Sequence, residues 1–158
     1  MSTDDDIFLA AIEPVDQVAQ WLAGALDLEP VQASDLLEGE HLFRGHARTA
    51  ERELVVLVAP NGYIEVDPEP DEVQAIDPYP IDVRVRLLGR KDEDLQLRET
   101  RAAFAALAES RPDIAMLLVH NLDTLVAAHL PGAGTHTFDE PISPDAPDID
   151  TWRPWVVT

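Results

Sequence analysis

Hydrophobic and polar residues follow two periods along the chain, and each period predicts one type of element. Residues 7–12 form a short apolar run that predicts a strand. Residues 15–27 carry apolar side chains at helical spacing, and Pro14 stands directly before them, where a helix tolerates proline. A second helical pattern covers residues 93–109. We therefore expect two main helices in this chain.

Several other runs have the alternation or the β-branched composition of strands. The clearest is residues 81–87, where apolar and charged side chains alternate strictly, so that one face is buried and the other carries mixed charge. The other strand-like runs cover residues 41–47, 53–59, 114–119 and 125–130. Between the last two, residues 120–123 have the composition of a turn.

The dipeptide Asn61-Gly62 stands between the strand-like runs 53–59 and 63–66. A two-residue hairpin turn needs positive φ at both central residues, which Asn-Gly adopts readily. We therefore expect a tight β-hairpin here. The following segment is interrupted by four prolines between residues 67 and 80, which predicts an extended, semi-rigid loop in place of a helix.

The order of these elements predicts an α+β fold, with a mostly antiparallel sheet and two main helices on one face. The length of 158 residues fits a single domain spanning residues 1–158. Residues 135–158 form a tail rich in Pro and Asp that contains Trp152 and Trp155. Because burial of an indole ring is strongly favourable, we expect this tail to dock on the body of the protein.

The composition excludes several classes of protein. Asp and Glu number 31 against 11 Lys and Arg, which gives a formal charge of −20. Phosphate binding needs clustered Lys and Arg, so direct binding to DNA, RNA or anionic lipid is not expected. No apolar run approaches the roughly 20 residues of a membrane helix. The acidic N-terminus is unlike a signal peptide and cysteine is absent, so we expect a cytoplasmic protein without disulfides.

The charges are segregated along the chain. Every Lys and Arg lies in residues 44–52 or 84–111, except Arg153. In the remaining stretches all the other charged residues are Asp or Glu. Extended fields of one sign steer a partner of opposite charge, so a basic protein partner is expected. A solvated acidic surface or an adaptation to high salt explains the same composition, and composition does not separate these interpretations.

No enzyme signature is present. No serine lies in a Gly-x-Ser-x-Gly turn, and the glycines form no phosphate-binding loop. No histidine has metal-ligand spacing, so no metal and no cofactor are expected. An acid–base site remains an alternative, built from His120 and Asp123 with His129 or His136.

Aromatic residues beside acidic ones suit a surface that binds a cationic partner. Tyr79 lies between two prolines in a loop that we expect to be rigid and exposed, whereas Trp152 and Trp155 are interpreted as core residues. The expected partner contacts are the acidic residues around this loop together with its tyrosine: Glu65, Asp67, Glu69, Asp71, Glu72, Asp77 and Tyr79.

The order of elements resembles that of small cytoplasmic immunity proteins of bacterial polymorphic toxin systems. The features that carry this resemblance are the opening strand and helix, the strand 63–66 beside the Asn-Gly turn, the helix 93–109, the apolar strand 114–119 and the Trp-containing tail. The resemblance implies a protein without catalytic residues that covers the active site of a basic toxin. The alternatives are a secretion chaperone or adaptor for a cytoplasmic client, and a nucleic-acid mimic whose carboxylates replace phosphates.

Overall fold

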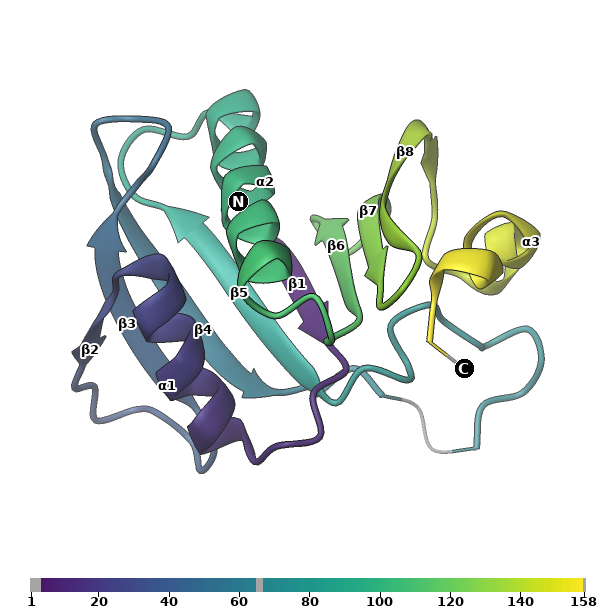
Figure 1. Ribbon diagram of the computed structural model, residues 1–158, viewed down its shortest axis with the longest axis horizontal. Helices are drawn as coiled ribbons and strands as arrows, with labels where there is room; N and C mark the ends of the chain where they lie inside the picture. The colour runs from purple at the N-terminus through teal and green to yellow at the C-terminus, as the bar shows by residue number, and fades with distance from the viewer. Residues whose placement is uncertain (1–3, 65–66, 158) are drawn as a thin grey trace.

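The computed structural model describes residues 4–64 and 67–157, which form an eight-stranded antiparallel sheet with the two long helices on one face (Figure 1). The strand order is β2-β3-β4-β5-β1-β6-β7-β8. This architecture confirms the predicted α+β class with a mostly antiparallel sheet. In the described part of the chain, no helix is both long and apolar enough to cross a membrane.

The elements follow one another as β1 (Asp5–Leu9), α1 (Val15–Leu26), β2 (Glu29–Val31), β3 (His41–His46), β4 (Glu53–Pro60), β5 (Ile81–Leu87), α2 (Glu93–Ser110), β6 (Met116–His120), β7 (Thr124–Leu130) and β8 (Gly134–Ile142). The tail then forms three short turns of helix, η1 (Ala146–Asp148), α3 (Ile149–Trp152) and η2 (Arg153–Trp155). Both predicted helices and the five internal strand-like runs are confirmed, whereas β2 and β8 are additional strands.

The two helices pack side by side, α1 over β3 and β4, and α2 over β5, β1 and β6. Leu22 of α1 and Leu107 of α2 are fully buried in the core between helices and sheet. Burial of one such side chain contributes roughly 1.5–3 kcal/mol. The start of α2 is fixed by Asp92, whose Oδ1 accepts a hydrogen bond of 3.1 Å from the backbone N–H of Leu95.

A second core lies on the opposite face of β1, β6 and β7. Phe8 and Leu117 of the sheet pack there with Tyr79 of the β4–β5 connection and with Trp152 of the tail. The connection and the tail therefore cover this half of the sheet, as Figure 1 shows on the side of β6–β8. The burial of Trp152 agrees with its interpretation as a core residue, and its indole N–H donates a 3.0 Å hydrogen bond to the carbonyl of Asp145.

The predicted Asn-Gly hairpin is wrong. β4 is paired with β3 on one side and with β5 on the other, so it has no free edge for a strand that begins at residue 63. Neither Asn61 nor Gly62 has the positive φ that the turn requires. Tyr63 and Ile64 are not in a strand, and residues 65–66, the remainder of the expected strand, lie outside the described residues.

Asn61 instead fastens the long connection between β4 and β5. Its buried side-chain amide donates hydrogen bonds to the carbonyl oxygens of Ile76 (3.1 Å) and Tyr79 (2.8 Å). Its Oδ1 accepts a 2.9 Å hydrogen bond from the backbone N–H of Tyr63. A residue at the beginning of the connection is thus bonded to residues near its end, which closes the connection into a loop.

We expect Asn61→Ala to lower the free energy of unfolding by about 1–3 kcal/mol, because three hydrogen bonds to a buried amide are lost. Gly62→Ala is the matched control, since a Cβ at Gly62 meets no atom within 4 Å and its φ is not positive. Urea unfolding measures both changes, and hydrogen exchange at residues 75–80 shows whether the loop opens. Equal stability of the two variants would contradict the role assigned to Asn61.

Candidate functional site

The connection between β4 and β5 lies beside the C-terminal tail (Figure 1). Gln74 Nε2 donates a hydrogen bond of 3.0 Å to Asp145 Oδ1, and the backbone N–H of Ala75 donates one of 2.7 Å to the carbonyl of Pro144. Four of the predicted contact residues in this connection have exposed side chains: Asp67, Glu69, Asp71 and Glu72. The structure therefore brings an acidic loop and an acidic tail together on one surface.

An apolar groove of about 360 Å³ lies between the connection and the tail. Val73 and Pro78 line it from the connection, and Trp152 and Val156 line it from the tail, with Arg153 also at its wall. An apolar groove in an acidic surface suits the side chain of a Lys or Arg, whose hydrocarbon stem packs on apolar groups while its charge reaches carboxylates. We call this groove and the exposed carboxylates of residues 67–72 the acidic groove surface.

The other three predicted contacts are Tyr79, Asp77 and Glu65. Tyr79 is fully buried, so its expected exposure is wrong. Its ring covers the apolar face of the sheet, its hydroxyl accepts a 3.4 Å hydrogen bond from the N–H of Val157, and burial raises the pKa of Tyr79 to about 12. Asp77 lines the groove and is half-buried, and its Oδ2 accepts a 2.9 Å hydrogen bond from the N–H of Gln74, which closes a turn. Glu65 lies outside the described residues.

Two further large side chains of this connection are exposed. Tyr63 and Ile64 are 36% and 42% exposed at the beginning of the same connection, where the sequence pattern predicted a hairpin strand. Large apolar side chains that stay exposed beside carboxylates are typical of interface residues. The sequence did not predict the exposure of these two side chains, because their position after Asn61-Gly62 indicated a half-buried hairpin strand.

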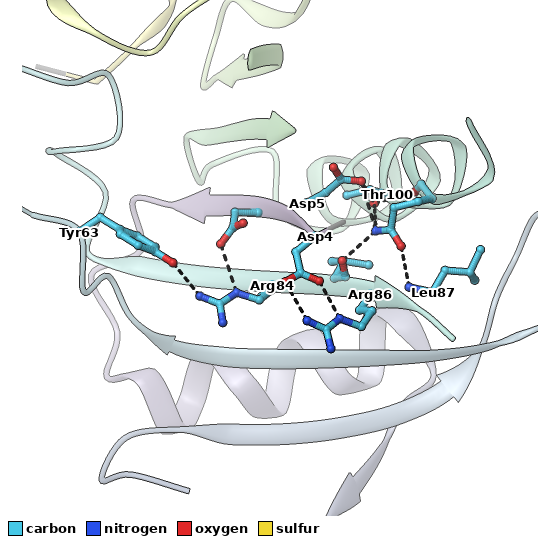
Figure 2. Close-up of polar contacts among 10 residues, drawn as sticks. Asp4, Asp5, Tyr63, Arg84, Arg86, Leu87 and Thr100 are labelled. Carbon is cyan, nitrogen blue, oxygen red and sulfur yellow. Dashed lines mark hydrogen bonds and ion pairs between the residues drawn. The ribbon is translucent and has the colours of Figure 1, made fainter. Parts of the chain in front are cut away.

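A separate polar cluster lies on the sheet face opposite the helices. Asp6 of β1 faces Arg84 across the β1–β5 ladder and Phe8 faces Asp82, so the two carboxyls are diagonal neighbours on that face. Both are almost fully buried, at 1% and 5% exposure. The Arg84 guanidinium lies 3.8 Å from a carboxyl oxygen of Asp6 and 3.8 Å from one of Asp82. It donates a hydrogen bond of 2.8 Å to the hydroxyl of Tyr63 (Figure 2).

This carboxyl pair holds a proton at neutral pH. Burial and the hydrogen bond to Asp82 raise the pKa of Asp6 to about 9, and burial raises the pKa of Asp82 as well. Asp6 Oδ2 and Asp82 Oδ1 are buried and accept no hydrogen bond from the described residues. One proton between the two carboxyls supplies the missing donor and reduces the repulsion between them.

The histidines of the alternative acid–base site have different partners. His120 Nδ1 lies 2.5 Å from Asp5 Oδ1, whereas His129 contacts Thr135 Oγ1 and a backbone carbonyl, each at 3.0 Å. His136 stacks on the ring of Trp155 with 4.0 Å between ring centroids. Within residues 4–64 and 67–157, no group of three His, Asp or Glu residues has the geometry of a metal site.

A comparison of the chain with protein-family models, curated proteins and solved structures finds no match. Function is therefore inferred from the geometry of the chain.

We expect the free energy of unfolding to fall as the pH rises from about 4 to about 9, because Asp6 binds a proton more tightly in the folded protein than in the unfolded chain. The contribution is complete below the ordinary pKa of 3.8 and is lost as the pH rises through about 9. One such group changes stability by at most about 1.4 kcal/mol per pH unit. Urea unfolding between pH 4 and pH 10 measures this slope.

Asp6→Asn should remove most of this pH dependence, since Asn cannot release the shared proton. Asp139→Asn, which changes an exposed carboxylate on β8, is the control and should keep the wild-type profile. Parallel stability profiles for the wild type and Asp6→Asn would show that Asp6 does not hold a proton in the folded protein.

Proposed function

We propose that this chain is a cytoplasmic protein-binding inhibitor of the immunity type, which occludes a basic partner enzyme and has no catalytic role of its own. The observation that carries the proposal is the acidic groove surface: an apolar groove of about 360 Å³ next to four exposed carboxylates. Protein interfaces typically combine a water-excluding apolar centre with a polar rim.

The charge of the region favours a basic partner. No Lys or Arg occurs between Arg52 and Arg84, so the whole connection contributes negative charge, and Asp145 and Asp150 of the tail are exposed beside it. A field of one sign raises the association rate with a partner of opposite sign and makes that rate depend on salt. Association is therefore the step at which these carboxylates act.

The acidic loop is also held in place before any partner arrives. Asn61 closes it, Tyr79 anchors it in the second core, and the hydrogen bonds of Gln74 and Ala75 join it to the tail. A surface that is ordered in advance loses less conformational entropy on binding than a flexible loop. Long connections within compact domains are usually functional, which supports a binding role for this one.

Reversal of two loop charges tests the contact surface. Glu69→Lys with Asp71→Lys should slow association with the partner by roughly tenfold at low salt and flatten its salt dependence. Glu51→Lys with Glu109→Lys is the matched control, because it makes the same change in net charge at exposed residues outside the loop and the tail. Association rates are measured over a range of ionic strengths.

The partner itself is recovered by affinity capture from host lysate at low salt, with elution in a salt gradient. Inhibition of a basic enzyme in a one-to-one complex supports the proposal when the wild-type protein inhibits and the loop variant inhibits more weakly. Equal association rates for the two double variants would remove the assignment of the site. An unfolded client would instead support a chaperone, and competition by DNA for the same partner would support a nucleic-acid mimic.

A further inference from the structure

The two basic zones of the sequence meet at one end of the sheet. Residues 47–52 follow β3 and residues 88–92 follow β5, so both lie at the end of β5 opposite the acidic loop. The N–H of Leu88 donates to the carbonyl of Glu53 at 2.9 Å, and Arg52 Nη1 donates to the carbonyl of Arg90 at 2.7 Å. These contacts hold the two basic loops side by side.

A hollow of about 150 Å³ opens between these loops and the beginning of α2. Its lining includes the basic residues Arg52, Arg90 and Lys91. Arg86 of β5 also contributes, but strand alternation turns its side chain to the face opposite α2, where it pairs with Asp4. Asp92 is the one carboxylate among the lining residues, and its Oδ1 already accepts the hydrogen bond from Leu95 that caps α2. The hollow is therefore a positively charged place on a protein whose formal charge is −20.

Three of these cations have no carboxylate partner in the described part of the chain. Arg44, Arg84, Arg86 and Arg111 all form ion pairs with Asp or Glu. Arg52, Arg90 and Lys91 form none; the same holds for Arg48, Arg98, Arg101 and Arg153, but only the first three line one hollow. Cations that gather without a counter-charge repel one another, and an anion bound between them relieves that repulsion.

The hollow is built from side chains and backbone that are fixed by neighbours. Gly89 has a φ of +104°, and an ideal Cβ at this position would lie 3.7 Å from Cδ of Arg52, so the backbone passes close to that side chain. Arg86 is held by Asp4 through two hydrogen bonds of 2.7 and 2.9 Å (Figure 2). Asp4 thereby neutralises Arg86, whereas Arg52 is held by the carbonyl of Arg90 and so loses less side-chain entropy when it binds an anion.

Buried Glu99 of α2 fixes the loop that carries Arg52. Its carboxylate accepts hydrogen bonds from the backbone N–H groups of Arg48 and Thr49, each of 2.9 Å, and from the hydroxyl of Thr49 at 2.8 Å. The loop is thus bonded to the same helix whose first turn borders the hollow.

We propose that this hollow binds a small oxyanion of the phosphate class, with Arg52, Arg90 and Lys91 as its ligands. Guanidinium and ammonium groups are the side chains that proteins use for phosphate. The volume is below the roughly 300–1,000 Å³ of pockets for drug-sized ligands, so one or two phosphoryl groups fit and a larger molecule must extend outward. Exposed Glu51, Glu93 and Asp94 lie around the basic loops and disfavour a long polyanion such as nucleic acid.

Titration with inorganic phosphate and with pyrophosphate tests the site, with chloride at matched ionic strength as the blank. Calorimetry and the thermal unfolding midpoint should show saturable binding that persists at about 0.15 M salt. Arg90→Gln with Lys91→Gln should weaken the affinity by at least about tenfold, because two charged donors are lost. Both side chains are exposed and make no hydrogen bond in the described chain, so the variant should fold.

Arg98→Gln with Arg101→Gln removes the same charge from exposed positions of α2 outside the hollow and should bind as the wild type does. Equal weakening by the two double variants would overturn the proposal, since it would mean attraction by net charge alone. Absence of saturable binding of either anion to the wild type would also overturn it. Titration with adenosine triphosphate distinguishes a free phosphate ligand from a nucleotide. An affinity equal to that of pyrophosphate means that the hollow recognises the phosphoryl groups alone.

Because the hollow and the acidic groove surface lie at opposite ends of β5, this inference does not depend on the proposed inhibitor function. Association with a basic partner should be unchanged by the Arg90 and Lys91 substitutions, so the two proposals can fail separately.

Discussion

Two consecutive carboxyl groups on the central strand are the constraint on which the rest of the structure depends. Asp5 and Asp6 of β1 point to opposite faces of the sheet and both are buried. On the helix face, Asp5 Oδ2 accepts hydrogen bonds from Thr100 Oγ1 at 2.7 Å and Gln96 Nε2 at 3.2 Å, both from α2 (Figure 2). Because a buried carboxyl without donors is strongly unfavourable, α2 has to lie across β1 at this height.

On the opposite face of the sheet, the buried carboxyl of Asp6 is stabilised by different groups. No helix donates there in the described chain, so Asp6 depends on Asp82 and Arg84 of the neighbouring strand and on a proton shared with Asp82. This polar cluster divides that face. Towards β6 and β7 the face is apolar and is covered by the β4–β5 connection and the tail, while towards β3 and β4 it stays partly exposed. The acidic loop is thus positioned by the apolar half of the sheet that it covers.

Regular periods made most of this fold predictable, and long-range contacts made the rest unpredictable. α1, α2 and β5 have uninterrupted patterns, whereas β8 contains Gly, Pro and two acidic residues and is a strand because it pairs with β7. The hairpin turn predicted at Asn61-Gly62 does not form, because the Asn61 amide instead donates hydrogen bonds to carbonyls 15 and 18 residues away. Among the described residues, adjacent positive φ values of 53° and 58° occur at Asn121 and Leu122 instead. The exposed carboxylates of residues 67–72 were predictable from Pro and Asp, but the burial of Tyr79 was not, since it depends on the sheet beneath it.

The two ends of the molecule are held by separate sets of contacts. The acidic groove surface depends on Asn61, on the second core and on the tail, while the basic loops depend on Glu99 and on the first turn of α2. Because α2 is also fixed by Asp5, the basic loops are held through the helix face of the sheet, whereas the acidic groove surface is held through the opposite face. Loss of the tail would therefore disturb the acidic surface first, and a change in the Asp5 network would reach the basic hollow first. Substitutions at one end of the molecule can in this way alter that end without unfolding the other.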